Sequence, residues 1–141
     1  MADGGLKTFD LSLVTPEGAV FEGEAQMLIV PGAAGEIGVL PRHAPLVAML
    51  KAGEIRVKAS GEWQSFAAGA GYFKVQRDRA IVLVDAAVRA EEIDVQEARQ
   101  EADEARALLE RAVAGDEEID RWKVEQRLRH AENKIAVSGR G

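Results

Sequence analysis

The two histidines of the chain are the first side chains to consider for chemistry, because a histidine can bind a metal or carry a proton near neutral pH. His43 lies in the segment GEIGVLPRHAPLVAML, residues 35–50, and His130 lies near the end of the chain. Neither has an H-x-x-x-H or H-E-x-x-H neighbour, and the chain has 0 cysteines. We therefore predict no metal site and no paired catalytic groups around either histidine.

The glycine-rich stretch at Gly69-Ala70-Gly71 is the other sequence to test for a reaction site. A phosphate-binding loop leads into a helix, but this stretch is followed by Tyr-Phe-Lys-Val, which is typical of a strand. The stretch is better interpreted as a bend. The sequence predicts no cofactor and no enzyme activity of its own.

Residues 35–50 therefore need another explanation. Pro41 and Pro45 restrict the backbone on either side of Arg42 and His43, so the segment predicts a stiff loop with polar side chains. Such a loop suits docking to a partner. A hydrogen bond from His43 that only holds the turn is an equally weighted alternative.

Composition and charge exclude several classes of partner. The chain has 141 residues and a formal net charge of −6 at pH 7, which disfavours nucleic acid and anionic lipid. The N-terminus has no pattern of a signal or transit peptide, and no apolar run reaches the roughly 20 residues that span a bilayer. We therefore expect the chain to be soluble by itself.

The elements that must position these side chains follow from two hydrophobic periods. From Phe9 to Val84 the apolar residues alternate or form short runs between turn residues, which predicts strands. From Ala98 to Ala112, and again from Val124 to Ile135, they recur at helical spacing. Asp94 followed by Glu97 has the form of a capping pair and predicts the start of the first helix. The predicted fold is α+β and mainly β at the N-terminus, with a β-sandwich over residues 1–88 and an antiparallel two-helix hairpin over residues 89–141.

The helical hairpin has two further features. Its first stripe is built mainly of alanine, and a buried methyl group contributes much less free energy than a leucine. Its first segment is acidic and its second is basic, which favours antiparallel docking, or else only balances two solvated faces. We hypothesise that the hairpin docks moderately well and can move as a unit.

The two tryptophans of the chain are large apolar side chains with one polar atom each. Trp63 falls in a predicted hairpin strand and Trp122 in the second helix. We expect both to pack inside the protein, with a partner surface as the alternative.

The motifs as a whole resemble one known family, the epsilon subunit of bacterial F-type ATP synthase. The similarity covers nearly the whole chain. The residues that carry it are Val14-Thr15-Pro16, Val20-Phe21-x-Gly23-Glu24, Val30-Pro31-Gly32-x-x-Gly35-Glu36-x-Gly38-Val39-Leu40-Pro41-x-His43-Ala44-Pro45-Leu46, Gly53-x-Ile55-Arg56-Val57, Ile81-Val82-Leu83-Val84 and Ala90-Glu91-Glu92-Ile93-Asp94. Two segments depart from the family, which commonly has glycine at the position of Arg42 and Ser-Gly-Gly in place of Gly69-Ala70-Gly71.

This resemblance implies a non-catalytic rotor subunit of a proton-translocating complex. In the family, the sandwich lies at the foot of the central stalk against the gamma subunit and the ring of c subunits. The loop that holds Glu36, Arg42 and His43 is implied to face the ring and gamma. The implied location is peripheral, on the cytoplasmic face of the bacterial inner membrane.

The resemblance also implies a regulatory role for the hairpin. In the family it can fold against the sandwich or extend toward the alpha and beta subunits, where basic side chains of the second helix hinder ATP hydrolysis. By position, the candidates in this chain are Arg121, Lys123, Arg127, Arg129 and Lys134.

Some members of the family bind ATP through an Ile/Leu-Asp-x-x-Arg-Ala motif. The matching stretch, residues 93–98, keeps Asp94 but has Glu97 where the phosphate-binding arginine belongs. A carboxylate repels phosphate, so we predict that ATP binding is weak or absent. A nucleotide-sensing binding protein is thus the less favoured alternative function.

Overall fold

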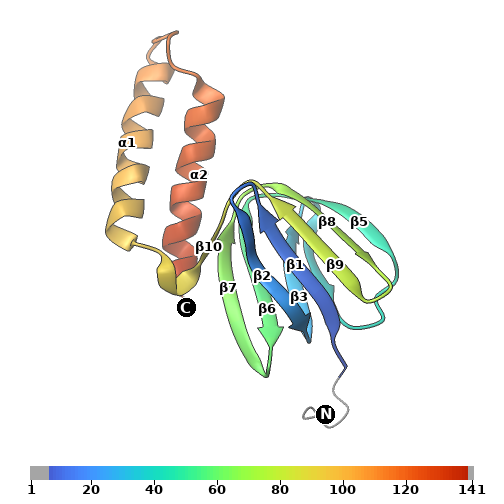
Figure 1. Cartoon of the computed structure of the whole chain (residues 1–141). Coiled ribbons are helices and arrows are strands. Elements are labelled where there is room, and N and C mark those ends of the chain that lie inside the picture. The colour runs from blue at the N-terminus through green and yellow to red at the C-terminus, as the bar shows by residue number, and fades with distance from the viewer. Residues whose placement is uncertain (1–6, 140–141) are drawn as a thin grey trace.

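The computed structural model describes residues 7–139, in which a β-sandwich is followed by two helices (Figure 1). Period-two alternation gives the strands their buried and exposed faces. The strands are β1 Phe9–Thr15, β2 Gly18–Ala25, β3 Met27–Gly32, β4 Gly35–Val39, β5 Leu46–Leu50, β6 Gly53–Ala59, β7 Glu62–Ala68, β8 Gly71–Gln76, β9 Arg79–Val84 and β10 Ala87–Arg89. A 3-10 turn, Ala90–Glu92, leads into α1 Val95–Val113 and α2 Arg121–Ser138.

The pairing of the strands builds two layers. One runs β10-β7-β6-β3 and carries β4 on the other side of β3, and the second runs β5-β8-β9-β1-β2. The two layers join where Gly32 of β3 pairs with Leu50 of β5. The β1 and β9 strands are parallel, whereas the other pairs are antiparallel. The sequence-based prediction of a sandwich is confirmed.

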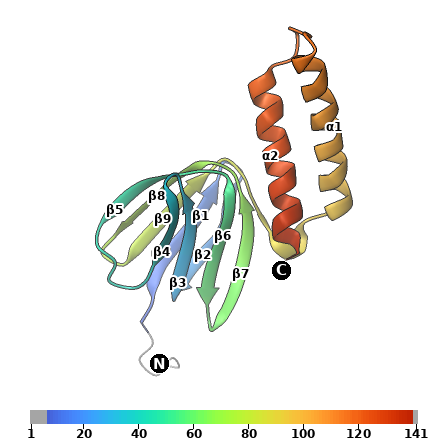
Figure 2. The same cartoon turned by 180° about the vertical axis from the view of Figure 1, so that it is seen from behind.

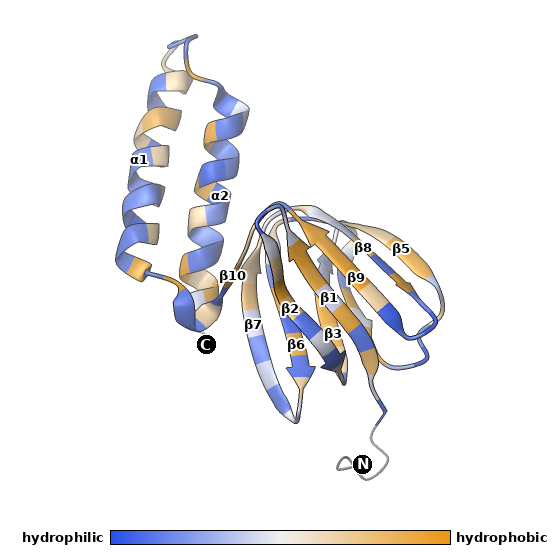
Figure 3. Cartoon of the chain, in the orientation of Figure 1, coloured by the Kyte–Doolittle hydropathy of each residue, from blue (hydrophilic) through white to orange (hydrophobic). Residues whose placement is uncertain are grey.

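The core of the sandwich consists of the side chains that face inward from both layers. Its largest fully buried members include Phe66, Phe73, Leu11, Leu13 and Leu28. In β9 the exposure alternates from residue to residue, so Ala80, Val82 and Val84 point inward. The hydrophobic stretches of these strands contrast with the mostly hydrophilic helices in Figure 3.

Backbone geometry explains the bend predicted at residues 69–71. A β-carbon on Gly71 would overlap the carbonyl oxygen of Leu83, and one on Gly69 would overlap the carboxylate of Asp85. Glycine is therefore required at position 71 by the close approach of the β9 backbone. At Gly69 the atoms in the way belong to the end of the Asp85 side chain, which can rotate aside, so the serine that the family commonly has there is compatible with the bend.

An aspartate caps the start of each helix. The side chain of Asp94 accepts a hydrogen bond from the backbone N–H of Glu97, and Asp120 does the same for Lys123. These N-caps satisfy backbone groups that have no partner within the helix. The cap predicted at Asp94 is confirmed.

The helices pack on each other as an antiparallel pair, as predicted (Figure 1). The buried side chains of α1 are Ala98, Ala102 and Ala105, which lie on the predicted alanine stripe. In α2, Val137 is buried, whereas Ile135, which the predicted stripe included, is only half-buried. The reason is that α2 has two neighbours, α1 on one side and the sandwich on the other.

The hairpin is attached to the sandwich through α2, and α1 lies on the far side of it (Figure 2). The Asn133 side-chain amide donates hydrogen bonds to the carbonyl oxygens of Gly53, at 2.9 Å, and Ala68, at 3.3 Å. Next to them, Val137 packs in a small apolar cluster with Ala67 and Ala90. This attachment is small compared with the core of the sandwich.

Arg89, at the end of β10, ties the layers together where the hairpin begins. Its guanidinium donates to the side-chain oxygen of Gln64 on β7 at 2.6 Å and to the carbonyl of Val20 on β2 at 3.0 Å. It also lies 5.4 Å from the ring centre of Phe66, a cation–π distance. No signal in the sequence pointed to this role, because the partners lie 25 and 69 residues away.

Candidate interaction surfaces

The loop between β4 and β5 brings Arg42 and His43 together at one end of the sandwich. Arg42 has φ 65°, in the left-handed region that favours glycine, and its backbone N–H donates to Asp78 Oδ1 at 2.6 Å. His43 Nδ1 donates to the carbonyl oxygen of Ala44 at 2.6 Å. The predicted local hydrogen bond of His43 is therefore present.

Glu36 lies elsewhere. It opens β4 beside the turn from β3, whereas Arg42 and His43 follow the opposite end of that strand. Its carboxylate lies 3.5 Å from the guanidinium of Arg56 on β6. The structure thus groups two of the three predicted loop residues and separates the third.

A second surface was missed by the sequence reasoning. The outward faces of β5, β8 and β9 carry exposed apolar side chains that are neighbours in the strand register, since Met49 pairs with Tyr72 and Tyr72 with Leu83. Val47 and Met49 are each 66% exposed and Tyr72 is 51% exposed. We call this the apolar face, made of Val47, Met49, Tyr72, Ile81 and Leu83.

The sequence did contain a signal for this face. A strand with one wetted side alternates apolar and polar residues, but residues 81–84 of β9 read Ile-Val-Leu-Val without a break. Such a run indicates that both sides of the strand become covered. Contiguous exposed apolar side chains mark interaction sites on folded proteins.

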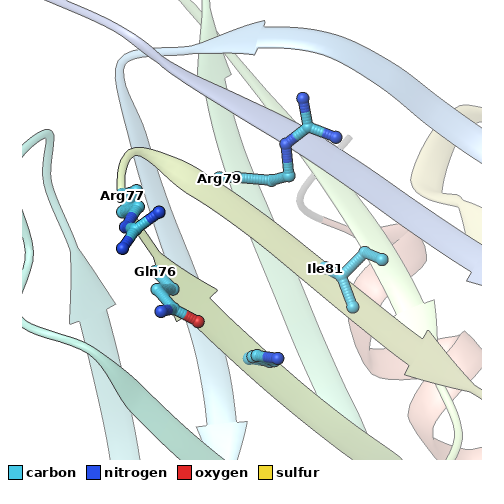
Figure 4. A pocket seen from close by; sticks show the side chains of 5 residues that line it. Gln76, Arg77, Arg79 and Ile81 are labelled. Carbon is cyan, nitrogen blue, oxygen red and sulfur yellow. The ribbon is translucent and has the colours of Figure 1, made fainter.

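Beside the apolar face lies a hollow of about 360 Å³ at the turn from β8 to β9 (Figure 4). Its lining residues are Lys74, Gln76, Arg77, Arg79 and Ile81. We call it the basic hollow. The apolar face ends here, because Ile81 belongs to both and pairs with Lys74 in the register.

Some basic side chains of α2 form ion pairs with acidic side chains of the chain, and others do not. Lys134 Nζ lies 2.7 Å from the Glu101 carboxylate of α1, and Arg121 pairs with Glu125 at 3.0 Å. Within residues 7–139, Lys123, Arg127 and Arg129 form no ion pair within 4.0 Å. The pair of Lys134 with Glu101 has the predicted sense, a cation of the second helix on an acid of the first. A second interhelix pair joins Arg106 of α1 and Glu132 of α2 at 3.2 Å, with the charges the other way round.

His130 lines a groove between α1 and α2, together with Glu101, Glu104 and Arg127. Its Nδ1 is buried without a hydrogen-bond partner among the described residues. Burial, and next the nearby Lys134, lower the pKa of His130 below its ordinary value of 6.5, while Asp85 and Glu101 oppose the shift. The neutral imidazole is therefore the form that fits the docked hairpin.

The stretch that corresponds to the family's nucleotide motif has a structural use. Asp94 caps α1, with its Oδ1 accepting from the Glu97 N–H at 3.1 Å. Glu97 is exposed in the first turn of that helix. A carboxylate at this place would face any phosphate that approached the helix start.

The expectation that both tryptophans pack inside the protein is wrong. Trp63 is 47% exposed on β7 and Trp122 is 67% exposed near the start of α2, so neither is packed inside. Their strand and helix already bury smaller residues, such as Phe66 and Val124, on the inward side.

The described residues contain no cluster of three or more side chains suited to a metal ion. Among the same residues, no helix is both long and apolar enough to cross a bilayer. The features that the structure does gather are exposed surfaces. Together with the sandwich and hairpin, they make surfaces for contact with partners the candidate functional sites of this chain.

Similarity to known proteins shows the family to which this chain belongs. Residues 8–90 match the model of the ATP synthase Delta/Epsilon chain, beta-sandwich domain. The ATP synthase epsilon chain of Desulforamulus reducens is 41% identical, over 94% of this chain and 98% of its own length. That of Halalkalibacterium halodurans is 38% identical, over 96% of this chain and 100% of its own. The chain belongs to the ATP synthase epsilon chain family, whose members are accessory subunits and not the catalytic ones.

Solved structures agree with this membership. A chain in the mitochondrial ATP synthase of Euglena gracilis, solved as an OSCP/F1/c-ring assembly, superimposes with a TM-score of 0.78 at 25% identity. The match covers 95% of this chain and 84% of that one. A chain of the Tetrahymena thermophila central stalk and c-ring shares the fold, with a TM-score of 0.56 at 10% identity.

Proposed function

We propose that the chain is a non-catalytic rotor subunit in the central stalk of a proton-translocating F-type ATP synthase. It would link the c-ring to the gamma subunit and reach the cytoplasmic face of the bacterial inner membrane only through the complex. The observation that carries the proposal is the apolar face. A chain that worked alone would gain nothing from leaving Val47, Met49 and Tyr72 exposed side by side.

The apolar face is assigned to gamma. It lies on the outer surface of three paired strands and offers an aromatic side chain, Tyr72, between aliphatic ones. Buried aromatic anchors with apolar neighbours are the residues that dominate binding energy in protein interfaces. A stable link is what a rotor subunit needs, because it must turn with gamma.

Binding to purified gamma subunit tests this assignment. The double variant Met49→Glu with Tyr72→Ser should weaken binding about 10- to 100-fold, measured by calorimetry. Trp63→Ser is the matched control, since it removes an exposed aromatic side chain from β7 and should leave binding unchanged. Unchanged binding of the double variant would refute the assignment, and failure of the wild-type chain to bind gamma would refute the rotor function.

The loop with Arg42 and His43 is assigned to the c-ring, while Glu36 contributes to the gamma or ring interface from the other end of β4. Arg42 is exposed, and its backbone is fixed to Asp78 of the next turn, so the charge is held on a stiff tip. Arg42→Glu in the assembled enzyme should lower proton-driven ATP synthesis. Lys58→Glu is the control for the charge change, and equal synthesis by both variants would leave the loop a merely structural turn.

The hairpin is assigned a regulatory contact with the alpha and beta subunits. In the docked form Lys134 is held by Glu101, whereas Arg127 and Arg129 have no ion pair within the described chain. The assignment predicts that Arg127→Glu with Arg129→Glu raises ATP hydrolysis by the complex, because like charges would then face acidic surfaces. Hydrolysis equal to that of the wild type would mean that these cations do not inhibit.

A further inference from the structure

The outer surface of β5, β8 and β9 changes character along its length. At one end, Met49, Tyr72 and Leu83 form an apolar row across the three strands. One pleat further, Lys74 joins Val47 and Ile81, and the surface ends at Arg77 and Arg79 in the basic hollow (Figure 4). The apolar face and the basic hollow are therefore parts of one continuous surface.

The cations of the hollow are not neutralised by the chain itself. Among residues 7–139, Lys74, Arg77 and Arg79 form no ion pair within 4.0 Å. Three acids are near in the fold. Asp10 is the register partner of Arg79 on β1, Glu22 of β2 lines a neighbouring hollow with Asp10 and Arg79, and Asp78 follows Arg77 and accepts the Arg42 N–H. None of these acids lines the basic hollow itself, whose charged lining side chains are Lys74, Arg77 and Arg79, so its lining is positive although the whole chain has a net charge of −6.

The backbone holds one of these cations in an uncommon geometry. Arg77 and Asp78 form the turn between β8 and β9 with φ 53° and 57°, values at which Asn-Gly is preferred. An arginine at this position is held in a left-handed conformation that costs side-chain-bearing residues free energy. The turn thus places Arg77 at the surface beside the other lining residues of the hollow.

We propose that the basic hollow receives carboxylate side chains of the same protein surface that covers the apolar face. This inference rests on the proposed function for the identity of that protein, the gamma subunit, and adds the chemistry of its surface. Gamma should present an apolar strip that continues into at least two acidic side chains. The pairing would fix which way round the two subunits dock, because the reversed orientation would bring carboxylates onto Tyr72 and Leu83.

Carboxylates fit this hollow better than phosphates do. Protein interfaces combine an apolar centre with a charged rim, which is the order found along these strands. An anionic membrane surface or a free nucleotide is the alternative source of negative charge. Neither would use the apolar row that continues from the hollow.

The test compares salt dependence of gamma binding in two charge-matched variants of the full chain. Lys74→Glu with Arg79→Glu reverses two cations of the hollow, and Lys58→Glu with Arg99→Glu reverses two cations outside it. We expect the first variant to raise the Kd for gamma at least tenfold at low salt. The wild-type Kd should rise between 50 and 500 mM NaCl, and the rise should disappear only in the hollow variant.

Each outcome decides the matter. If the hollow variant keeps the wild-type Kd and salt dependence while Met49→Glu with Tyr72→Ser still loses binding, the gamma contact stands and the carboxylate pairing is wrong. If neither variant affects binding, both the carboxylate pairing and the assignment of the apolar face to gamma are wrong, whereas failure of the wild-type chain to bind gamma would refute the proposed function itself. If the wild type binds vesicles of anionic phospholipid, or inorganic phosphate, through the hollow with gamma binding unaffected, the hollow recognises phosphate and the inference is overturned.

Discussion

The sandwich and the helical hairpin are held together in different ways. The sandwich buries aromatic and large aliphatic side chains such as Phe66, Phe73 and Leu28, whereas the first helix buries only Ala98, Ala102 and Ala105. Each alanine removes far less apolar area from water than a phenylalanine does. The hairpin also depends on hydrogen bonds and ion pairs to its neighbours. This difference teaches that one sequence can encode a base with a large apolar core and an attached element with a much smaller one.

Core truncation in the sandwich should have the largest effect. Phe73→Ala leaves a cavity at a side chain that is 0% exposed, so the free energy of unfolding should fall by about 3–5 kcal/mol. Tyr72→Ala is the control, because this neighbour points outward on the same strand and should cost less than about 0.5 kcal/mol. Urea denaturation followed by circular dichroism measures both. Equal losses would mean that the two faces of β8 are not distinguished as described.

Release of the hairpin should come next in size. Asn133→Ala removes the donor to Gly53 and Ala68, leaving two carbonyl oxygens to find other partners, at a cost of about 1–3 kcal/mol to docking. Hydrogen exchange should then speed up for the amides of α1 and α2 and stay unchanged in the sandwich. Arg129→Ala, exposed on the same helix, should change neither. Faster exchange across the whole chain would contradict independent release.

The pH dependence of docking should be smaller still. The pKa of His130 is lowered in the docked hairpin, so the undocked state binds more protons just below 6.5, the ordinary value. Stability from docking is therefore full above that pH and is lost as the pH falls below it. Helix-amide exchange, corrected for intrinsic rates, measures the loss. In His130→Gln the dependence on pH should flatten, and an unchanged profile would show that another group titrates.

The smallest effect should be a gain within the sandwich. Arg42 adopts a φ of 65°, so Arg42→Gly removes the cost of a side chain in the left-handed region. The gain is offset in part by the greater freedom of glycine in the unfolded chain, which leaves about 0.5 kcal/mol. Arg42→Ala removes the same charge but keeps the β-carbon and should not stabilise. Calorimetric melting temperatures distinguish the two, and a gain in both variants would assign the effect to charge.

Much of the fold could be predicted because the spacing of apolar residues along the sequence indicates strands and helices locally. Alternation identified the strands, helical spacing identified α1 and α2, and Asp94 identified where α1 begins. The resemblance of residues 30–46 to the epsilon subunit predicted the family of the chain. The similarity to known ATP synthase epsilon chains confirms this prediction. The predicted site residues were placed by analogy, and Glu36 shows the limit of this, because it lies at the other end of β4 from Arg42.

Other features depended on contacts between distant residues, which no local pattern contains. The left-handed turn at Arg42 is fixed by Asp78, 36 residues away, and Lys134 is held by Glu101, 33 residues away. Asn133 gave no signal, since a polar residue on a helix is usually solvated.

The sequence by itself determined which residues form strands and helices, because backbone conformation and side-chain period are local properties. Only the tertiary structure decided which sides of those elements stay uncovered. In β9 the residues Ile81 and Leu83 are as apolar as Val82 and Val84, so nothing local separates the face toward the core from the face toward a partner. Packing of one sheet on the other makes that choice, and it leaves the apolar face and the basic hollow open.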